Sequence, residues 1–349
     1  VVAEGTKYLL IVCISYPAVA ITNVLSSVLR SVELVKLPTY VSLITTILNI
    51  FLDYGMIFGK FGFEKRGITG AAIATTISAW VGVFLILIVS LITKNILYAP
   101  LKNTFGFKWL DIKLFYKKAL PVIFNETMWG AGTFVFNIIF GHMGHEYFAA
   151  ITILRSFENI AFVFIIGICN ACSIMVGKSV GKGKIERGIQ DTKRFLIIFP
   201  VISAIIAVVI YVFRAEFIGI FNMGNNISEI TLNSAMSIMA FYAFEFTIRQ
   251  VSFLMIVGIF RSGGDTVTGV KYDLLTLWGL SIPATLIAVY VLKVPFTVAF
   301  AVMYIFEDYI KSIMCLKYYK SMKWIKPVTS EGKDGLSEYL QERGMKNVT

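Results

Sequence analysis

The sequence predicts an all-α polytopic membrane protein, and three observations support this fold class. Of the 349 residues, 57% are hydrophobic and 15% are charged, which excludes an ordinary soluble protein. Apolar stretches of about 20 residues, the length of a helix that crosses a bilayer, recur along the whole chain. Lys and Arg gather in alternate connections between these stretches, so membrane topology explains the net charge of +11 better than a nucleic-acid partner does.

Nine transmembrane helices are predicted from these stretches. Glycine and proline inside them are tolerated where neighbouring helices satisfy the freed backbone groups. The predicted spans are Tyr8–Val28, Thr39–Phe58, Ile68–Ile92, Tyr116–Phe140, Phe148–Val176, Phe195–Phe213, Leu232–Phe260, Val270–Leu292 and Thr297–Leu316.

The basic residues also predict the orientation of the chain. Most of them lie in the connections after the first, third, fifth and seventh spans, and the tail after the ninth span adds more. By the positive-inside rule, this side faces the cytoplasm. We therefore expect a multi-pass protein of the cell membrane, with its C-terminus in the cytoplasm and residue 1 on the outer face.

A short internal repeat indicates two related halves. Aligning Leu29-Arg30-Ser31 with Phe260-Arg261-Ser262 gives an offset of 231 residues, which also places the second span on the eighth and the third on the ninth. At this offset, the spans that would match spans four to six in the repeat lie before residue 1. We therefore expect a transporter of twelve helices in two six-helix lobes, with three of them preceding this sequence.

This scheme divides the chain into four parts. Residues 1–93 are expected to form the second half of the N-terminal lobe, and residues 119–329 the six helices of the C-terminal lobe. Between them, residues 94–118 form a cytoplasmic connection. Its segment FGFKWLDIKLFYKK mixes aromatic and basic residues like an interfacial amphipathic helix. Residues 330–349 are polar and are expected to be an exposed cytoplasmic tail.

Asn49 and Asp53 lie deep in the second predicted span, four residues apart and therefore on one helix face. A carboxylate in a span is costly unless it is paired, solvated or bound to a cation, so we expect Asp53 to be functional. The alternative is that Asp53 lies near the end of the span and contacts headgroup water. Ala71 and Thr75 share a face of the third span. With Asn49 and Asp53 they would form an oxygen cage for a hard cation, unless they serve only helix packing.

Glu126 and Trp129 in the fourth span suggest a site for organic cations. A carboxylate beside an aromatic ring attracts a cation by charge and by cation–π contact. The alternative is a structural carboxylate that pairs with Arg155 or Lys118. Asn23, in the first span, is expected to contact substrate or to hydrogen-bond between helices.

Glu245 and Arg249 lie in the middle of the seventh span. Because they are four residues apart, they are expected either to pair within the helix or to line the cavity of the second lobe. Arg155 and Glu158 in the fifth span are candidates for the same network. Weaker candidates are Asp273, Glu307 and Asp308; Glu307 and Lys311 have the spacing of a helix-stabilising pair.

The sequence indicates neither a metal centre nor an enzyme. Cys169 and Cys172 have CxxC spacing but no second pair of ligands, and His142 and His145 also lack further ligands nearby. The segment GKSVGKGK lacks the spacing of a nucleotide-binding loop. We therefore expect no cofactor and no catalytic residues.

Four stretches carry a family resemblance: LRSVELVKLPTYVSLITTILNIFLDYGMIFGKFGFEKRGITGAAIAT, ALPVIFNETMWGAGTFVFNIIFGHMG, VGKSVGKGKIERG and FRSGGDTVTGVKYDLLTLWGLSIP. They resemble multidrug and toxic compound extrusion (MATE) transporters, in the prokaryotic branch with the DNA-damage-inducible type members. The resemblance implies twelve helices in two lobes and export of organic cations against inward flow of sodium or protons. It also implies a sodium or proton site at Asn49 and Asp53, completed by an Asp from the first helix.

We therefore predict a secondary active antiporter that exports organic, often cationic, compounds in exchange for Na⁺ or H⁺. Its partners are a small-molecule substrate and the lipid bilayer, without nucleic acid, and the protein is expected to be a monomer. The alternative is a flippase for lipid-linked oligosaccharides from the same wider superfamily. That activity requires several basic residues in the cleft, and Arg155 and Arg249 are the chief basic residues within the predicted spans.

Overall fold

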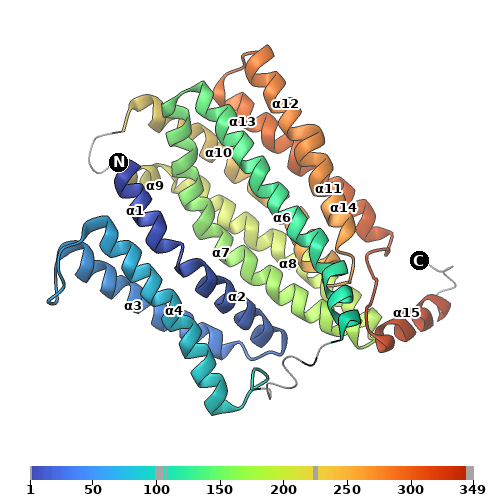
Figure 1. Ribbon diagram of the computed structural model, residues 1–349. Helices are drawn as coiled ribbons and strands as arrows, with labels where there is room; N and C mark the ends of the chain where they lie inside the picture. The colour runs from blue at the N-terminus through green and yellow to red at the C-terminus, as the bar shows by residue number, and fades with distance from the viewer. Residues whose placement is uncertain (1, 99–105, 107, 223–226, 343–349) are drawn as a thin grey trace. The chain divides into compact units, whose positions relative to one another are not determined.

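The computed structural model describes residues 2–98, 106, 108–222 and 227–342, and these residues are almost entirely helical (Figure 1). Extended pairing within the described ranges is confined to one isolated bridge between Gly264 and Ile325. The chain divides into two compact units, Val1–Trp109 and Leu110–Thr349. The predicted all-α class is confirmed, and the division into lobes at residues 93 and 119 stays a prediction.

The first unit is built around α4 (Gly67–Thr93), which packs against α1 (Val2–Val12), α2 (Ser15–Ser31) and α3 (Lys36–Phe58). Small residues allow this close approach, since a Cβ on Gly82 would lie 3.3 Å from Thr45. The first predicted span is a bent pair, because Gly5–Val12 and Ser15–Ser31 meet at 41°.

The second unit contains the remaining helices. Several of them run without a break from α-helical turns into π-helical turns. Such π-helical turns often mark functional sites. The elements are α6 (Trp109–Met143), α7 (His145–Gly181), α8 (Ile185–Val212), α9 (Arg214–Phe221), α10 (Glu229–Phe253), η1 (Leu254–Phe260), α11 (Val267–Leu274), η2 (Leu275–Ser281), α12 (Ile282–Leu286), η3 (Ile287–Val291), α13 (Phe296–Tyr304), η4 (Ile305–Tyr309), α14 (Ile310–Lys320) and α15 (Ser330–Glu342).

The α10 helix is the centre of the second unit. It packs against α7, α8, α13, η4 and α14, and Figure 1 shows it enclosed by its neighbours. Its side chains Tyr242 and Phe246 are fully buried, together with Phe300 of α13. Polar side chains that α10 carries are therefore placed in the interior of the unit, where they need partners.

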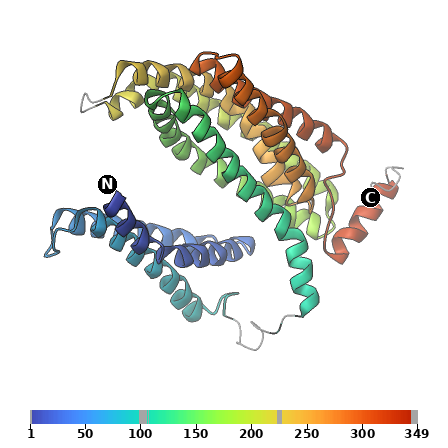
Figure 2. The same ribbon diagram turned by 45° about the horizontal axis from the view of Figure 1, so that its top comes forward.

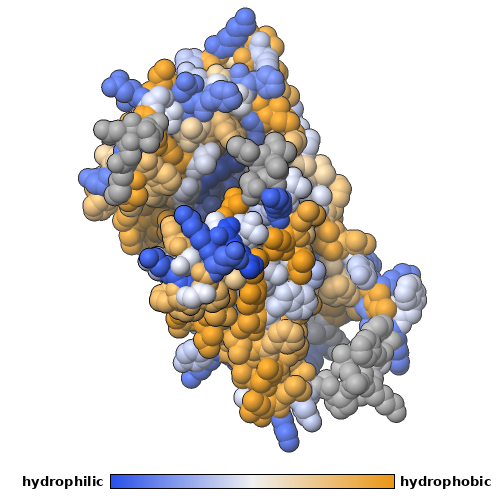
Figure 3. All heavy atoms as spheres, turned by 60° about the vertical axis from the view of Figure 1, so that its left-hand side comes forward, coloured by the Kyte–Doolittle hydropathy of each residue, from blue (hydrophilic) through white to orange (hydrophobic). Residues whose placement is uncertain are grey.

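Six described helices are both long and apolar enough to cross a membrane, and the bent α1–α2 pair makes a seventh candidate. Figure 3 shows apolar side chains covering large continuous stretches of the surface, which lipid would cover. Two further predicted spans correspond to α6 and to the helix from Phe296 to Lys320, which are not among the six. The total of nine spans stays a prediction.

Two segments outside the predicted spans are also helical. Residues 109–118, expected in an interfacial amphipathic helix, continue without a break into α6, and their place at the membrane surface stays a prediction; Phe105 and Phe107 lie outside the described residues. The tail from Ser330 to Glu342 is the helix α15, which packs against the ends of α7 and α8 (Figure 2). Leu340 is buried there, so this part of the tail is folded, while most of its side chains are exposed as expected.

Candidate functional site

The second unit contains a buried network of charged side chains from α7, α10, α11, η4 and α14. Arg249 of α10 is one of its two cations, and it forms a short ion pair with Glu158 of α7. Its Nε lies 4.0 Å from Oδ2 of Asp308, and the guanidinium lies 5.4 Å from the centroid of the Tyr304 ring. These contacts from three sides fix the orientation of Arg249.

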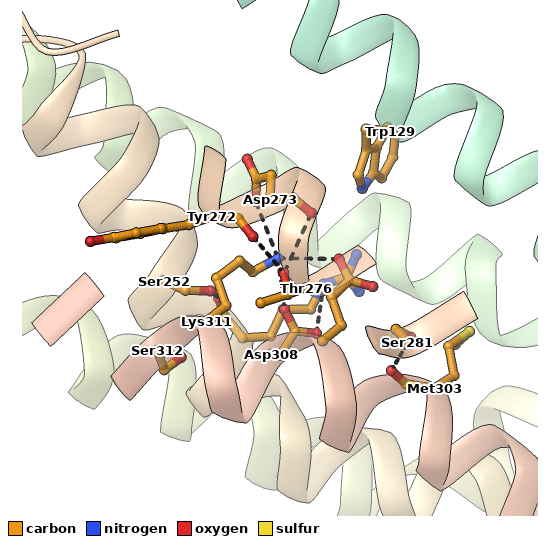
Figure 4. A network of polar contacts seen from close by, with 12 residues as sticks. Trp129, Ser252, Tyr272, Asp273, Thr276, Ser281, Met303, Asp308, Lys311 and Ser312 are labelled. Atoms are coloured by element: carbon orange, nitrogen blue, oxygen red, sulfur yellow. Dashed lines mark hydrogen bonds and ion pairs between the residues drawn. The ribbon is translucent and has the colours of Figure 1, made fainter. Parts of the chain in front are cut away.

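Lys311 of α14 is the second cation of the network. Its ammonium nitrogen lies 3.1 Å from carboxylate oxygens of both Glu307 and Asp308, and 3.4 Å from Oδ1 of Asp273 on α11. Figure 4 shows the Lys311 side chain ending between the carboxyl groups of Asp273 and Asp308. Asn125 of α6 donates a hydrogen bond of 2.9 Å to Oδ2 of Asp273. Lys311 therefore joins α11 to η4 and α14, and Asn125 extends the network to α6.

Two cavities lie along this network, with volumes of about 300 and 250 Å³. Both are lined by Trp129, Phe162, Arg249 and Glu307. The larger one continues past aromatic side chains such as Tyr304, whereas the smaller one reaches the Lys311 cluster. An apolar, partly aromatic wall with a few convergent charges is typical of a site for organic ions.

The structure brings together most of the residues predicted for the second unit. Glu126 and Trp129 line the smaller cavity, and Arg155 lines the larger one together with Trp129. Arg249 lines both cavities. Glu245 is completely buried on α10, behind the cavity walls.

Two pairings that the sequence left open as alternatives are not formed among the described residues. The structure pairs Arg249 with Glu158 on another helix, rather than with Glu245 within α10. Glu126 forms its ion pair with Arg261, at 2.8 Å, rather than with Arg155 or Lys118. Lys118 instead donates to the Gly264 carbonyl oxygen at 2.7 Å. In both cases the packing of helices brings a residue that is distant in the sequence, Glu158 or Arg261, to the charged group in place of the partner that sequence spacing suggested.

In the first unit, Asn49 and Asp53 lie one turn apart on α3, and both are half-buried. Among the described residues, Nδ2 of Asn49 and Oδ1 of Asp53 are buried and have no hydrogen-bond partner. The hydroxyl oxygens of Thr22 on α2 and Ser78 on α4 are in the same situation. Carboxylate and hydroxyl oxygens are ligands that suit a hard cation, so Asp53, Thr22 and Ser78 each carry an unpartnered oxygen of the right chemical type.

The other residues predicted for this unit have less distinctive surroundings. Ala71 and Thr75 are half-buried on α4, which packs against α3. Thr76, the neighbour of Thr75, donates to the carbonyl oxygens of Ala72 and Ile11, as a packing residue does. Asn23 lies exposed on α2.

Sequence reasoning gave too little weight to Asp273, Asp308 and Lys311. The spacing Glu307, Asp308 and Lys311 places three charges on neighbouring faces of one predicted span, and an intramembrane charge signals function. The spacing of Glu307 and Lys311 by itself predicts only a helix-stabilising pair. Their contact is confirmed at 3.1 Å, but both are largely buried.

Comparison with known proteins identifies the family. The MatE family model matches residues 1–55 and 121–287, more than half of the chain. A probable multidrug resistance protein NorM from Thermotoga maritima is 27% identical over 324 residues, which are 93% of this chain and 68% of that protein. The uncharacterized transporter YisQ of Bacillus subtilis is 24% identical over 88% of this chain and 66% of its own length. The chain thus spans about two thirds of the length of these two relatives.

Solved structures show the same fold. The MATE transporter VcmN of Vibrio cholerae, in its bent form, superposes with a TM-score of 0.72 at 17% identity. The match covers 90% of this chain and 68% of VcmN. At this identity the likeness shows the fold alone, and it agrees with the matched family model and with the resemblance found in the sequence. The chain belongs to the MatE family.

Proposed function

We propose that this chain serves in a secondary active exporter of organic, often cationic, compounds. The observation that carries this proposal is the pair of cavities in the second unit, where Trp129 and Tyr304 stand beside Glu158 and Glu307. Aromatic faces and carboxylates attract an organic cation, and apolar walls accept its hydrocarbon part. The relatives called probable multidrug resistance proteins are consistent with such a cargo.

We further propose that export is driven by inward flow of Na⁺ or H⁺ at the Asp53 region of the first unit. The unpartnered, buried Oδ1 of Asp53 supports this assignment. Asn49, one turn away on α3, is proposed to contribute its side-chain carbonyl oxygen. Ala71 and Thr75 are proposed to lie beside the ion. If the bound ion lowers the affinity of the protein for the exported compound, then the bound compound lowers the affinity for the ion by the same factor. The ion and the compound then bind in turn. Antiport follows if the ion site and the compound site open alternately to the two faces of the membrane.

The remaining topology belongs to the same proposal. The chain would contribute nine of twelve spanning helices in two lobes of a monomer in the cell membrane, with a cytoplasmic C-terminus. It would act without a cofactor and without catalytic residues. Asn23 and Arg155 are proposed to contact the substrate, together with Glu126, Trp129, Glu245 and Arg249.

A second candidate function is the flipping of a lipid-linked oligosaccharide. Four basic side chains, Arg155, Arg249, Arg261 and Lys311, line the cavities and would suit an anionic pyrophosphate. However, Arg249, Arg261 and Lys311 already pair with carboxylates, which reduces their attraction for an anion. The charge balance of the cavities therefore favours a cationic compound.

Transport assays distinguish the two candidates. The purified full-length protein is reconstituted in proteoliposomes and tested with a fluorescent organic cation and, separately, with a fluorescent lipid-linked pyrophosphate sugar. We expect gradient-dependent movement of the cation and no accelerated flipping of the lipid. Flipping of the lipid without movement of the cation would replace the exporter by the flippase.

A further inference from the structure

Among the described residues, four carboxyl groups line the smaller cavity, and they differ in how accessible they are. Three of them surround the ammonium group of Lys311, whose side chain is only 10% exposed. The fourth, Glu126 of α6, is 59% exposed, so a ligand reaches it without disrupting a buried cluster. The three carboxyl groups around Lys311 are those of Asp273, Glu307 and Asp308.

Glu126 already has a cation of the protein beside it. Nη2 of Arg261 donates a hydrogen bond of 2.8 Å to Oε1 of Glu126, and both side chains line the smaller cavity. Arg261 directly follows η1 and lies 135 residues after Glu126, so tertiary packing creates the pair. A guanidinium in a charge-assisted hydrogen bond offsets the negative charge that would otherwise attract an organic cation.

The aromatic ring next to Glu126 has no such internal partner. Trp129 lies three residues further along α6, lines the same cavity and is 49% exposed. Figure 4 shows its ring pointing from α6 towards the Lys311 side chain. Among the described residues, no cation of the protein lies over this ring, so its face stays available to a ligand.

We infer that Arg261 is an internal competitor of the exported compound. Its guanidinium pairs with the carboxylate that a bound organic cation takes over. The compound stacks on Trp129 and displaces Arg261 from Glu126, and Arg261 returns to Glu126 as the compound leaves. This inference deepens the proposed function and rests on it, because it assigns the residue that limits the affinity of the same site for cations. A limited affinity suits an exporter, which must also release its cargo.

The chain around Arg261 is held in place, so the displacement involves its side chain alone. Lys118 of α6 donates a hydrogen bond of 2.7 Å to the Gly264 carbonyl oxygen. Asp265, the next residue, pairs with Lys326 at 2.8 Å. These contacts fix the connection between η1 and α11 from two sides. A change of side-chain rotamer, which is fast, then removes the guanidinium from Glu126 while the helices keep their places.

The competition makes an unusual prediction, because removing a residue that lines the cavity should tighten binding. An internal competitor lowers the apparent affinity by the fraction of protein in which the site is free. Since a partly exposed ion pair is weak, Arg261→Gln should bind an organic cation about three- to tenfold more tightly. Glu126 stays solvated in this variant, so the fold should be retained.

Fluorescence titration with ethidium, an aromatic organic cation, tests this in the purified full-length protein. We expect the dissociation constant to fall in Arg261→Gln and to stay unchanged in Arg187→Gln, which removes an exposed arginine from α8. In a Glu126→Gln background, Arg261→Gln should no longer tighten binding, because the carboxylate for which the two cations compete is gone. Arg261→Met, which keeps the apolar stem, replaces Arg261→Gln if that variant does not fold.

Two results would overturn the inference while leaving the exporter in place. One is unchanged or weaker ethidium binding by Arg261→Gln, which would show that Arg261 does not compete. The other is a gain that persists in the Glu126→Gln background, which would assign the effect to the overall charge of the cavity. If ethidium binds to none of these proteins and to the unaltered protein neither, the proposed exporter falls, and this inference falls with it.

Discussion

The ammonium group of Lys311 lies 3.1 Å from Oδ1 of Asp308, three residues earlier in the same continuous helix. Two further carboxylates, Glu307 and Asp273, lie within 3.1 and 3.4 Å of the same nitrogen. The side chains of Lys311 and Asp308 are 10% and 2% exposed, so water contributes little to their solvation. The lysine therefore holds several acidic groups in a place where they would otherwise repel one another.

Replacing Lys311 by Met should destabilise the protein strongly. The substitution keeps the apolar stem but leaves three buried carboxylates without their cation, and breaking a buried ion pair from one side typically costs about 3–5 kcal/mol. Denaturant or thermal unfolding measures the loss. Lys317→Met on the exposed face of α14 is the control and should change stability little. Equal effects of the two substitutions would show that the Lys311 cluster does not stabilise the fold.

Replacing Trp129 by Ala should weaken binding of aromatic organic cations. Trp129 lines both cavities and is 49% exposed, so its ring face is accessible to a ligand. Loss of a cation–π contact of about 1–1.5 kcal/mol corresponds to about tenfold weaker binding. Fluorescence titration of the purified protein measures the dissociation constant. Trp109→Ala, at the exposed start of α6, should leave it unchanged, and equal weakening by both would argue against a site at Trp129.

Asp265, in the connection before α11, should make stability depend on pH. Burial alone would raise the pKa of its carboxyl group, but hydrogen bonds from Lys326, Tyr318 and Thr268 lower it to about 2, from an ordinary value of 3.8. The stabilisation is thus complete above the ordinary value and is lost as the pH falls towards 2.

We therefore expect Asp265→Asn to lower the unfolding temperature at neutral pH, and the difference from the unaltered protein to shrink in acid. Thermal melts of both proteins over a series of pH values provide the measurement. Glu338→Gln on α15 serves as the control for a charge change near the same end of the chain. A difference that stays constant down to the lowest pH would contradict the assigned role of Asp265.

Gly264 should tolerate no side chain. Its φ is +96°, and a Cβ there would lie 2.0 Å from the carbonyl oxygen of Lys326. Gly62 has a similar φ of +82° but open space around it. Gly62→Ala should therefore lower the free energy of unfolding by about 1–2 kcal/mol, the cost of a Cβ in a positive-φ conformation. Gly264→Ala should lower it further, because the segment after α14 must also move. Similar unfolding free energies for the two variants would contradict the close approach.

The sequence predicted the features that depend on local pattern. Apolar length and helical spacing are local, so the long helices and the Glu307–Lys311 contact follow from them. The pairing of Arg249 with Glu158, 91 residues away, depends on which faces of α7 and α10 meet. A single sequence does not show directly which helix faces meet. It therefore left open a pairing of Arg249 with Glu245 within α10, which the structure does not show.

The helix α15 is a second example of packing that a local sequence pattern does not reveal. Residues 330–342 are polar, which is typical of an exposed segment, yet α15 packs on the turn between α7 and α8. Thr329 donates a hydrogen bond of 2.6 Å to the Gly181 carbonyl oxygen, and a Cβ on Gly335 would lie 2.3 Å from the Gly183 carbonyl oxygen. Close packing by glycine buries little apolar surface, so hydropathy does not reveal it.

The central claim is that cation flow through the Asp53 region drives export, and one measurement tests it most directly. Efflux of a fluorescent organic cation from proteoliposomes is followed under a sodium gradient and, separately, under a proton gradient. The full-length protein is compared with its Asp53→Asn variant. We expect efflux to follow an imposed gradient and to be lost in the variant, while binding of the fluorescent cation is retained. Undiminished gradient-driven efflux by the variant would contradict the account.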